Sequence, residues 1–176
     1  MLYGTQIKLR PLVIDDVTDE YIKWMNDYEV VKYTESRFKQ HTRESIMEFV
    51  NNANNKKTHT FAIIANDYNK HIGNIKIGNI NWISRNGDIG LIIGRKEYYG
   101  RGIATEAIRL VTQYAFEQLN LNKVRCGIYA PNIGSIKAFQ KAGWEIYLTK
   151  PKMYLFEDEY VDCLYLRKIN NIRENG

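Results

Sequence analysis

The feature that most constrains the fold of this chain is an uninterrupted succession of a short apolar segment, a glycine loop and a long amphipathic helix. The apolar segment GDIGLIIG covers residues 87–94 and is typical of a strand inside a sheet. Apolar residues then recur at helical spacing, at Ala104, Ala107, Ile108, Val111, Tyr114 and Ala115. A strand that leads directly into such a helix predicts a sheet with a helix packed on its face.

The loop between them, EYYGRGIATEA from Glu97 to Ala107, has the composition of an anion site. Gly100 and Gly102 permit positive φ angles and let a ligand approach the main chain closely. The first turn of the following helix has N–H groups without helical partners and the positive end of the helix dipole. Arg101 adds a guanidinium suited to phosphate oxygens. The loop therefore favours a phosphate ligand, with a plain glycine turn as the alternative.

Two other phosphate-binding loops do not fit this spacing. A dinucleotide fingerprint needs G-x-G-x-x-G/A, and Thr105 stands where the last glycine or alanine should be. A Walker loop needs a lysine after its second glycine, and Ile103 follows Gly102 here. The phosphate that this loop would bind therefore belongs to another class of ligand.

Hydrophobic periodicity predicts the remaining elements. We expect further strands at 5–12, 58–65, 71–82, 123–130, 144–156 and 159–169, and further helices at 15–27, 42–50 and 133–142. Pro11 should end or edge the first strand, and Pro151 should break the strand in which it lies. Asp15 and Asp16 should cap the first helix. The segment 29–38 has no assigned structure.

This order of elements predicts an α+β fold with a mixed, largely antiparallel central sheet flanked by helices. No linker, repeat or low-complexity block divides the chain. A single domain over residues 1–176 is therefore predicted, with residues 170–176 frayed.

Composition limits the classes of partner. Lysine and arginine number 25 and aspartate and glutamate 20, a net charge of +5 that favours anionic ligands without indicating nucleic acid. Cys126 and Cys163 stand far apart, and no Cys/His spacing indicates a metal site. Lys8 and Arg10 stand where a signal peptide needs an apolar run, and no segment approaches the ~20 apolar residues of a membrane span. We expect a cytoplasmic protein without metal, membrane or nucleic-acid partners.

Two blocks of the sequence resemble the acetyl-CoA-binding core of the GNAT N-acetyltransferase superfamily. They are GDIGLIIGRKEYYGRGIATEAIRLVTQYAF and LNKVRCGIYAPNIGSIKAFQKAGW, in this order. The superfamily signature is Gln/Arg, two variable residues, Gly, one variable residue and Gly/Ala, and Tyr99, Gly102 and Ala104 stand in these places. The aromatic Tyr99 departs from Gln/Arg but resembles the Rim-type branch, which acetylates ribosomal-protein N-termini. The resemblance extends over about residues 6 to 168, including LRPLVIDDV, WMNDYEVVKY, NINWISRNGDIG and EYVD.

The resemblance implies a fold in which two central strands splay apart and hold coenzyme A, the co-substrate, between them. The main chain of the glycine loop would bind its pyrophosphate, at Tyr99, Gly100, Arg101, Gly102, Ile103 and Ala104. Its pantetheine arm would pair with the preceding strand, at Leu91, Ile92, Ile93 and Gly94. Asn132 and Lys137 would contact the far end of the arm and a phosphate. A helix N-cap and a solvated lysine are the respective alternatives for these two residues.

Acetyl transfer to an amine needs a base or a water chain for the amine proton, and donors for the thioester oxygen. Many superfamily members use a tyrosine as the acid, but Phe139 stands in that place and cannot donate a proton. Rim-type enzymes show a serine in the pattern N-x-x-S, which makes Ser135 the candidate acid; a helix serine bonded to backbone is the alternative. Asp88 is the candidate base, with an ion pair to Arg85 as the alternative. No nucleophile triad is recognisable, so direct transfer in a ternary complex is expected.

The acceptor pocket is expected between the first two helices and the late hairpin. Its candidate lining residues are Trp24, Asn26, Tyr33, Glu35, Arg37, Asn81, Trp82 and Tyr160. A protein N-terminal amine is the first hypothesis for the acceptor, and an amino sugar on a nucleotide or a polyamine are the alternatives. A polyamine pocket should be strongly acidic, whereas Glu35 and Arg37 give this wall mixed charge.

A different class of function also fits these residues. A protein that binds acetyl-CoA for regulation, without catalysis, would be consistent with the missing acid tyrosine. Small members of the superfamily often pair, so a homodimer is a further open alternative.

Overall fold

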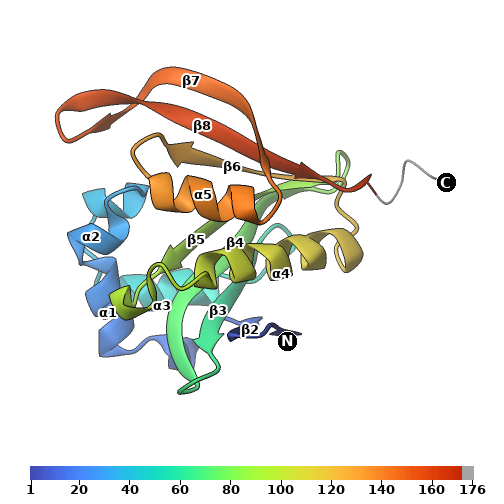
Figure 1. The fold of residues 1–176 in the computed structure, drawn as a ribbon. Helices are drawn as coiled ribbons and strands as arrows, with labels where there is room; N and C mark the ends of the chain where they lie inside the picture. Colours follow the sequence, from blue (N-terminus) through green and yellow to red (C-terminus); the bar gives the residue numbers. More distant parts are fainter. Residues whose placement is uncertain (172–176) are drawn as a thin grey trace.

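The computed structural model describes residues 1–171, which contain an eight-stranded sheet in the order β1-β2-β3-β4-β5-β6-β8-β7 (Figure 1). The strands are β1 (Leu2–Tyr3), β2 (Ile7–Pro11), β3 (His59–Ala65), β4 (Lys70–Asn81), β5 (Asn86–Ile93), β6 (Lys123–Tyr129), β7 (Glu145–Phe156) and β8 (Glu159–Ile169). The helices are α1 (Asp19–Met25), α2 (Tyr28–Val31), α3 (Arg43–Asn51), α4 (Ile103–Glu117) and α5 (Ile133–Lys141). Three short 3₁₀ helices complete the described part: η1 (Ile14–Asp16), η2 (Glu35–Phe38) and η3 (Lys96–Tyr98).

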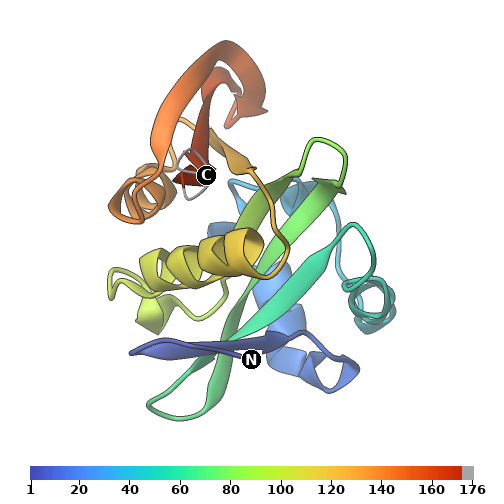
Figure 2. The same cartoon turned by 90° about the vertical axis from the view of Figure 1, so that its right-hand side faces the viewer.

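The sheet is antiparallel at every described pairing except the one between β5 and β6. These two strands run parallel and pair only from Asn86 to Asp88 and from Lys123 to Arg125, after which they separate. Figure 2 shows the leaf built from β1 to β5 diverging from the leaf of β6, β8 and β7. The predicted mixed, largely antiparallel sheet with two splayed strands is confirmed.

Helices cover both faces of this sheet. Helices α4 and α5 lie on one face and α1 to α3 on the other (Figure 2). Helix α4 buries the side chains that follow helical spacing, from Ile103 to Ala115, in the larger hydrophobic core. A second core on the opposite face joins Tyr21 and Trp24 of α1 to Ile46 and other residues of α3. Strand β3 is almost wholly buried because both cores pack on it.

The first 40 residues differ most from the expected elements. Helix α1 begins at Asp19 and is capped by Thr18, whose hydroxyl accepts from the Tyr21 amide. The predicted caps are wrong because the Asp16 carboxylate is held by Arg10 instead. The segment without assigned structure forms α2 and η2, and β1 was not expected. Each of these elements has four residues or fewer, too few to show a hydrophobic period.

The predicted break at Pro151 is also wrong. Strand β7 runs through this residue, and only its register with β8 shifts between Lys150 and Tyr154. Because β7 is the edge of the sheet, a residue without an N–H is tolerated there. The predicted fraying at residue 170 is wrong, since Asn170 is buried and its amide donates to the Leu121 carbonyl at 3.2 Å. Residues 172–176 lie outside the described part of the chain.

Candidate active site

A cleft of about 780 Å³ opens at the separation of β5 and β6. Strands β4 and β5 contribute Asn74, Lys76, Gly90, Leu91 and Ile92. Strand β6 and the start of α5 contribute Cys126, Gly127, Ile128, Asn132, Ser135 and Phe139. The segments of α1, η2 and α3 contribute Tyr21, Tyr33, Glu35, Lys39, His41, Glu48 and Phe49, among others. The cleft therefore joins the divergent strands to the helical layer on the α1–α3 face.

The glycine loop has the backbone geometry of an anion site. Gly100 has φ +73° and Gly102, the N-cap of α4, has φ +83°. Within the described chain, the amides of Gly100, Arg101 and Gly102 donate no hydrogen bond to another residue. The amides of Ile103 and Ala104 belong to the first turn of α4, where a helix leaves its N–H groups unpaired. Consecutive unpaired donors at the positive end of a 15-residue helix suit a phosphate group.

Two side chains of the loop are engaged by the protein itself. The Tyr99 hydroxyl donates to the Ile93 carbonyl at 3.0 Å, which ties the loop to the end of β5. The Arg101 guanidinium lies over the Tyr98 ring and 3.7 Å from the Asp67 carboxylate. Ile103 is buried in the core, so its side chain faces away from any ligand of the loop. The binding capacity of the loop thus resides mainly in its main chain.

The start of α5 brings Ser135, Asn132 and Phe139 to the cleft. Asn132 is the N-cap, since its side-chain oxygen accepts from the Ser135 amide at 3.3 Å. The Ser135 hydroxyl makes no hydrogen bond within the described chain, so it is free to interact in the cleft. Lys137, one of the predicted coenzyme contacts, is exposed and does not line the cleft.

Asp88 lies outside the lining of the cleft. Its carboxylate accepts from the Arg125 guanidinium at 2.6 Å and from the Asn79 amide at 2.9 Å. The expected alternative partner, Arg85, is therefore replaced by Arg125, which the parallel pairing of β5 and β6 brings opposite Asp88. Both carboxylate oxygens of Asp88 are therefore engaged by side chains of the protein itself.

The acceptor-side candidates divide into two groups. Tyr33 and Glu35 line the cleft. The Glu35 carboxylate accepts from the Tyr129 hydroxyl at 2.5 Å, and burial together with this hydrogen bond raises the pKa of Tyr129. Arg37 donates to the Tyr129 hydroxyl at 3.0 Å and to the Leu155 carbonyl at 2.9 Å, so it fastens η2 to β6 and β7.

The remaining candidates do not line the cleft. Trp24 is buried beneath Gly94, where an added Cβ would lie 2.0 Å from the indole ring. Asn26 bonds to the backbone of His41, and Asn81 and Trp82 bond to turns at the far end of β4. Tyr160 is exposed at the turn between β7 and β8. These side chains were expected in the acceptor pocket. In the structure they pack in the core, hydrogen-bond to the backbone or lie exposed at a turn.

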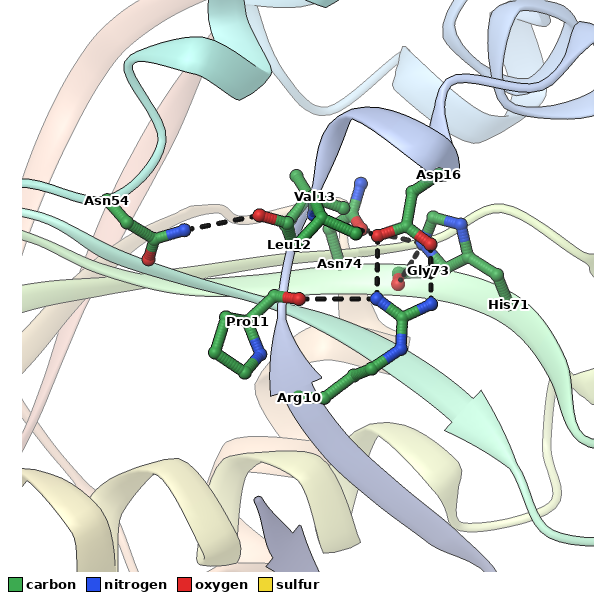
Figure 3. Close-up of polar contacts among 9 residues, drawn as sticks. All are labelled: Arg10, Pro11, Leu12, Val13, Asp16, Asn54, His71, Gly73 and Asn74. Atoms are coloured by element: carbon green, nitrogen blue, oxygen red, sulfur yellow. Dashed lines mark hydrogen bonds and ion pairs between the residues drawn. The ribbon is translucent and has the colours of Figure 1, made fainter.

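Behind the cleft, a buried ion pair anchors the segment that leads into α1 (Figure 3). Arg10 donates to both carboxylate oxygens of Asp16, at 2.6 and 2.7 Å, and the Val13 amide donates at 2.9 Å. Burial raises the pKa of Asp16, but the Arg10 hydrogen bonds and neighbouring positive charge outweigh it and leave the pKa below its usual value. The ring of His71 lies nearby, with Nε2 2.8 Å from Oδ1 of the cleft residue Asn74.

Sequence reasoning missed several residues of the cleft, of which Lys76 and Asn74 on β4 are the clearest. The segment HIGNIKIGNI alternates, and the alternation places Asn74 and Lys76 on the same face. Glu48 and Phe49 of α3 were also missed, because the sequence predicts a helix there but not what each face of it contacts. The alternation along β4 predicts that one face of the strand is polar, but it does not predict that this face lines the cleft.

Comparisons with known proteins agree with this geometry. Residues 6–145 match the model of the acetyltransferase (GNAT) domain. The chain belongs to the GNAT acetyltransferase family. The chain is 27% identical over 151 residues to the probable N-acetyltransferase YjcK of Bacillus subtilis, covering 82% of this chain and 83% of that one. It is 27% identical over 82 residues to the L-amino acid N-acetyltransferase AaaT of Escherichia coli, covering 47% and 50%.

A solved structure extends the likeness to nearly the whole fold. The spermidine N-acetyltransferase of Vibrio cholerae, determined in complex with CoA and spermine, superposes with a TM-score of 0.82 at 20% identity. The superposition covers 94% of this GNAT chain and 96% of that protein. The resemblance inferred from the two sequence blocks is thus confirmed at the level of the superfamily.

Two searches of the described residues gave no candidate. None of the helices in residues 1–171 is long and apolar enough to span a membrane. In the same residues, no three His, Cys, Asp or Glu side chains group closely enough to hold a metal ion.

Proposed function

We propose that this GNAT chain transfers the acetyl group of acetyl-CoA directly to a primary amine bound in the cleft. The observation that carries the proposal is the role of β5: its residues Gly90 to Ile92 line the cleft that also holds Ser135, and the strand leads into the loop with unpaired amides. Acetyl-CoA is a long thioester with a pyrophosphate at its far end. It therefore needs a phosphate-binding loop, an extended cleft and a hydrogen-bonding group near the thioester.

The residues present fit this co-substrate. The amides from Gly100 to Ala104 would hold the pyrophosphate, and a Cβ built on Gly100 would meet no atom within 4 Å, so the loop is open to a ligand. Between Leu91 and Ile93 the edge of β5 has no strand beside it on the β6 side and can pair with an extended arm. Asn132 and Lys137 would contact the arm and a phosphate.

Acetyl-CoA supplies an activated acetyl group as a thioester, which an amine can attack. The amine nitrogen forms a bond to the carbonyl carbon, the carbon–sulfur bond breaks, and the amine proton must leave. We assign Ser135 as the donor of a hydrogen bond or proton to the departing sulfur, because its hydroxyl is unengaged and faces the cleft. Asp88 receives less support as the base, because Arg125 and Asn79 already hold its carboxylate. A water chain from the cleft fits the geometry better.

An α-amine is the acceptor that the observations favour. The Rim-type features Tyr99 and Asn132-x-x-Ser135 support a protein N-terminal amine, and the likeness to an L-amino acid N-acetyltransferase supports the same functional group on a small molecule. The polyamine alternative is supported by the fold of the spermidine enzyme. The cleft opposes a polycation, since Lys39 and Lys76 stand beside Glu35 and Glu48. The amino-sugar nucleotide alternative has no specific observation in its favour.

The test is release of free thiol from acetyl-CoA in the presence of a panel of amines: N-terminal peptides, amino acids, polyamines and amino-sugar nucleotides. Acetylation of at least one class, with no labelled acetyl retained on the protein after acetyl-CoA alone, supports direct transfer. Tight binding of acetyl-CoA without turnover on any amine would instead favour a regulatory protein.

A further inference from the structure

We propose that Lys76 binds an anionic group of the acceptor, so that the acceptor is a primary amine that also carries a carboxylate or a phosphate. This inference rests on the function proposed above and adds to it a chemical requirement on the substrate. It starts from the position of one lysine in the middle of the sheet.

Lys76 lies on β4, a central strand of the sheet, and yet it is exposed. Its neighbours in the ladder are Thr60 on β3, which is buried, and Gly90 on β5. Helices lie on both faces of this sheet, so a side chain on one of its central strands would be expected beneath them. At Lys76 the cleft lies above the strand instead, and the lysine is one of the residues that line it.

The neighbouring glycine gives this lysine room to reach the place where the strands part. A Cβ built on Gly90 would lie 3.9 Å from Cε of Lys76. The lysine stem therefore extends across β5 over a position without a side chain. Gly90 lies two residues beyond Asp88, the last residue of β5 that pairs with β6. A thioester held between β5 and β6 would be approached by the acceptor from the cleft. The Lys76 side chain lines this same part of the cleft.

No protein carboxylate neutralises this ammonium within residues 1–171. Asp88 is the closest acid along β5 on the same face, and Arg125 and Asn79 occupy it at 2.6 and 2.9 Å. Because this exposed ammonium is unpaired and lines the cleft, it is available to an anionic ligand that enters there.

The other charges of the cleft give the acceptor an orientation. Lys39 adds a second ammonium to the lining, and no carboxylate of the described chain forms an ion pair with it. Glu35 and Glu48 supply carboxylates on the helical side. Glu35 is held by the Tyr129 hydroxyl and can receive an ammonium group. A molecule with an amine and an anion matches this pattern, whereas a polycation would meet Lys76.

The experiment compares acceptors that differ only in charge, with the wild-type protein and saturating acetyl-CoA. The pairs are an α-amino acid and its carboxamide, 2-aminoethyl phosphate and ethanolamine, and two peptides with Asp or Asn in second position. Initial rates are measured over a pH range, so that the different amine pKa values are separated from recognition. We expect kcat/KM for the anionic member of at least one pair to be about tenfold higher or more, corresponding to about 1.4 kcal/mol.

The variants Lys76→Met and Lys76→Glu identify the residue responsible. Lys76→Met should abolish the preference for the anion through an increased KM of the acceptor, with the KM of acetyl-CoA unchanged. Lys76→Glu should reverse the preference toward spermidine. The matched control is Lys57→Met, an exposed lysine outside the cleft, which should leave the preference unchanged. Thermal melting of each variant shows whether it is folded.

The outcomes separate the two proposals. If the wild type acetylates amines without preferring the anionic members, the inference about Lys76 is overturned and the acetyltransferase function stands. The same holds if Lys76→Met, shown to be folded, keeps the full preference. If no amine is acetylated while acetyl-CoA binds, the proposed function fails and the inference falls with it. A preference for the phosphate pair alone or for a carboxylate pair alone identifies the source of the anion.

Discussion

The glycine loop and the acceptor end of the cleft are built in different ways. The glycine loop offers main-chain amides from one continuous stretch, Tyr99 to Ala104. The acceptor end offers side chains from η2, α3, β4 and β6, which the fold brings together. A main-chain site tolerates side-chain changes and is sensitive to φ, whereas a side-chain site depends on the packing that orients it. Four substitutions distinguish a main-chain site from one that depends on packed side chains.

Asp16→Ala should have the largest effect, and on stability. It leaves Arg10, whose side chain is 30% exposed, without its partner, and we expect a loss of about 1–3 kcal/mol of unfolding free energy. Because the pKa of Asp16 is lowered in the folded state, its contribution is present above the unfolded pKa of 3.8 and is lost as pH falls through the folded pKa. Urea unfolding at pH 7 and at pH 3 measures both effects, and the difference between wild type and variant should shrink at pH 3. Asp15→Ala, an exposed neighbour, is the control.

Ser135→Ala should lower kcat by about 100-fold, the lower end for loss of a general acid or donor. The KM of acetyl-CoA should change little, because the loop amides are untouched. Ser135→Thr keeps a hydroxyl and should retain most of the activity. A kcat equal to that of the wild type in Ser135→Ala would remove this residue from the mechanism.

Gly102→Ala should weaken acetyl-CoA binding by about tenfold, since a side chain at φ +83° costs roughly 1–2 kcal/mol. Calorimetric titration with coenzyme A measures the loss. Gly134→Ala makes the same change in the first turn of α5, where an added Cβ meets no atom within 4 Å. That control should bind coenzyme A as tightly as the wild type, and equal losses in both variants would refute a special role for the loop conformation.

Arg101→Ala should have the smallest effect, less than about fivefold on acetyl-CoA affinity. The guanidinium is occupied by the Tyr98 ring and Asp67, and the main chain supplies the phosphate contacts. A much larger loss, suppressed by high salt, would show that the arginine turns toward the phosphate and that the loop is not a pure main-chain site.

The same contrast explains what could be predicted from the sequence. Strand β5, the loop and α4 were predicted closely because local signals define them: an apolar run, two glycines and a helical period. The N-cap, which was the alternative reading of Asn132, is observed, and Ser135, a candidate from the resemblance to Rim-type enzymes, lines the cleft. Arg37, Trp82 and Tyr160 were assigned to the acceptor wall from their chemical type alone. Their positions depend on contacts between distant segments, such as Arg37 with Leu155, which no local pattern encodes.

Lys76 shows the limit most clearly. Alternation along β4 assigns it to a face, but whether that face is solvent, core or cleft depends on where β5 and β6 part. Asp88 shows the same limit for an ion pair. Its partner Arg125 lies 37 residues away in the sequence, and the parallel pairing of β5 with β6 brings the two residues opposite each other. Charge pairing across a sheet is thus settled by topology and not by sequence proximity.

The short pairing of β5 with β6 has a mechanical consequence. Three residue pairs join the two leaves of the sheet directly. Side-chain contacts also link the leaves, among them Arg109 with Lys141 and Arg37 with Tyr129 and Leu155. An extended ligand bound between the separated ends of β5 and β6 would contact both leaves of the sheet next to this short pairing. Occupation of the cleft would then add contacts between the two leaves of the sheet.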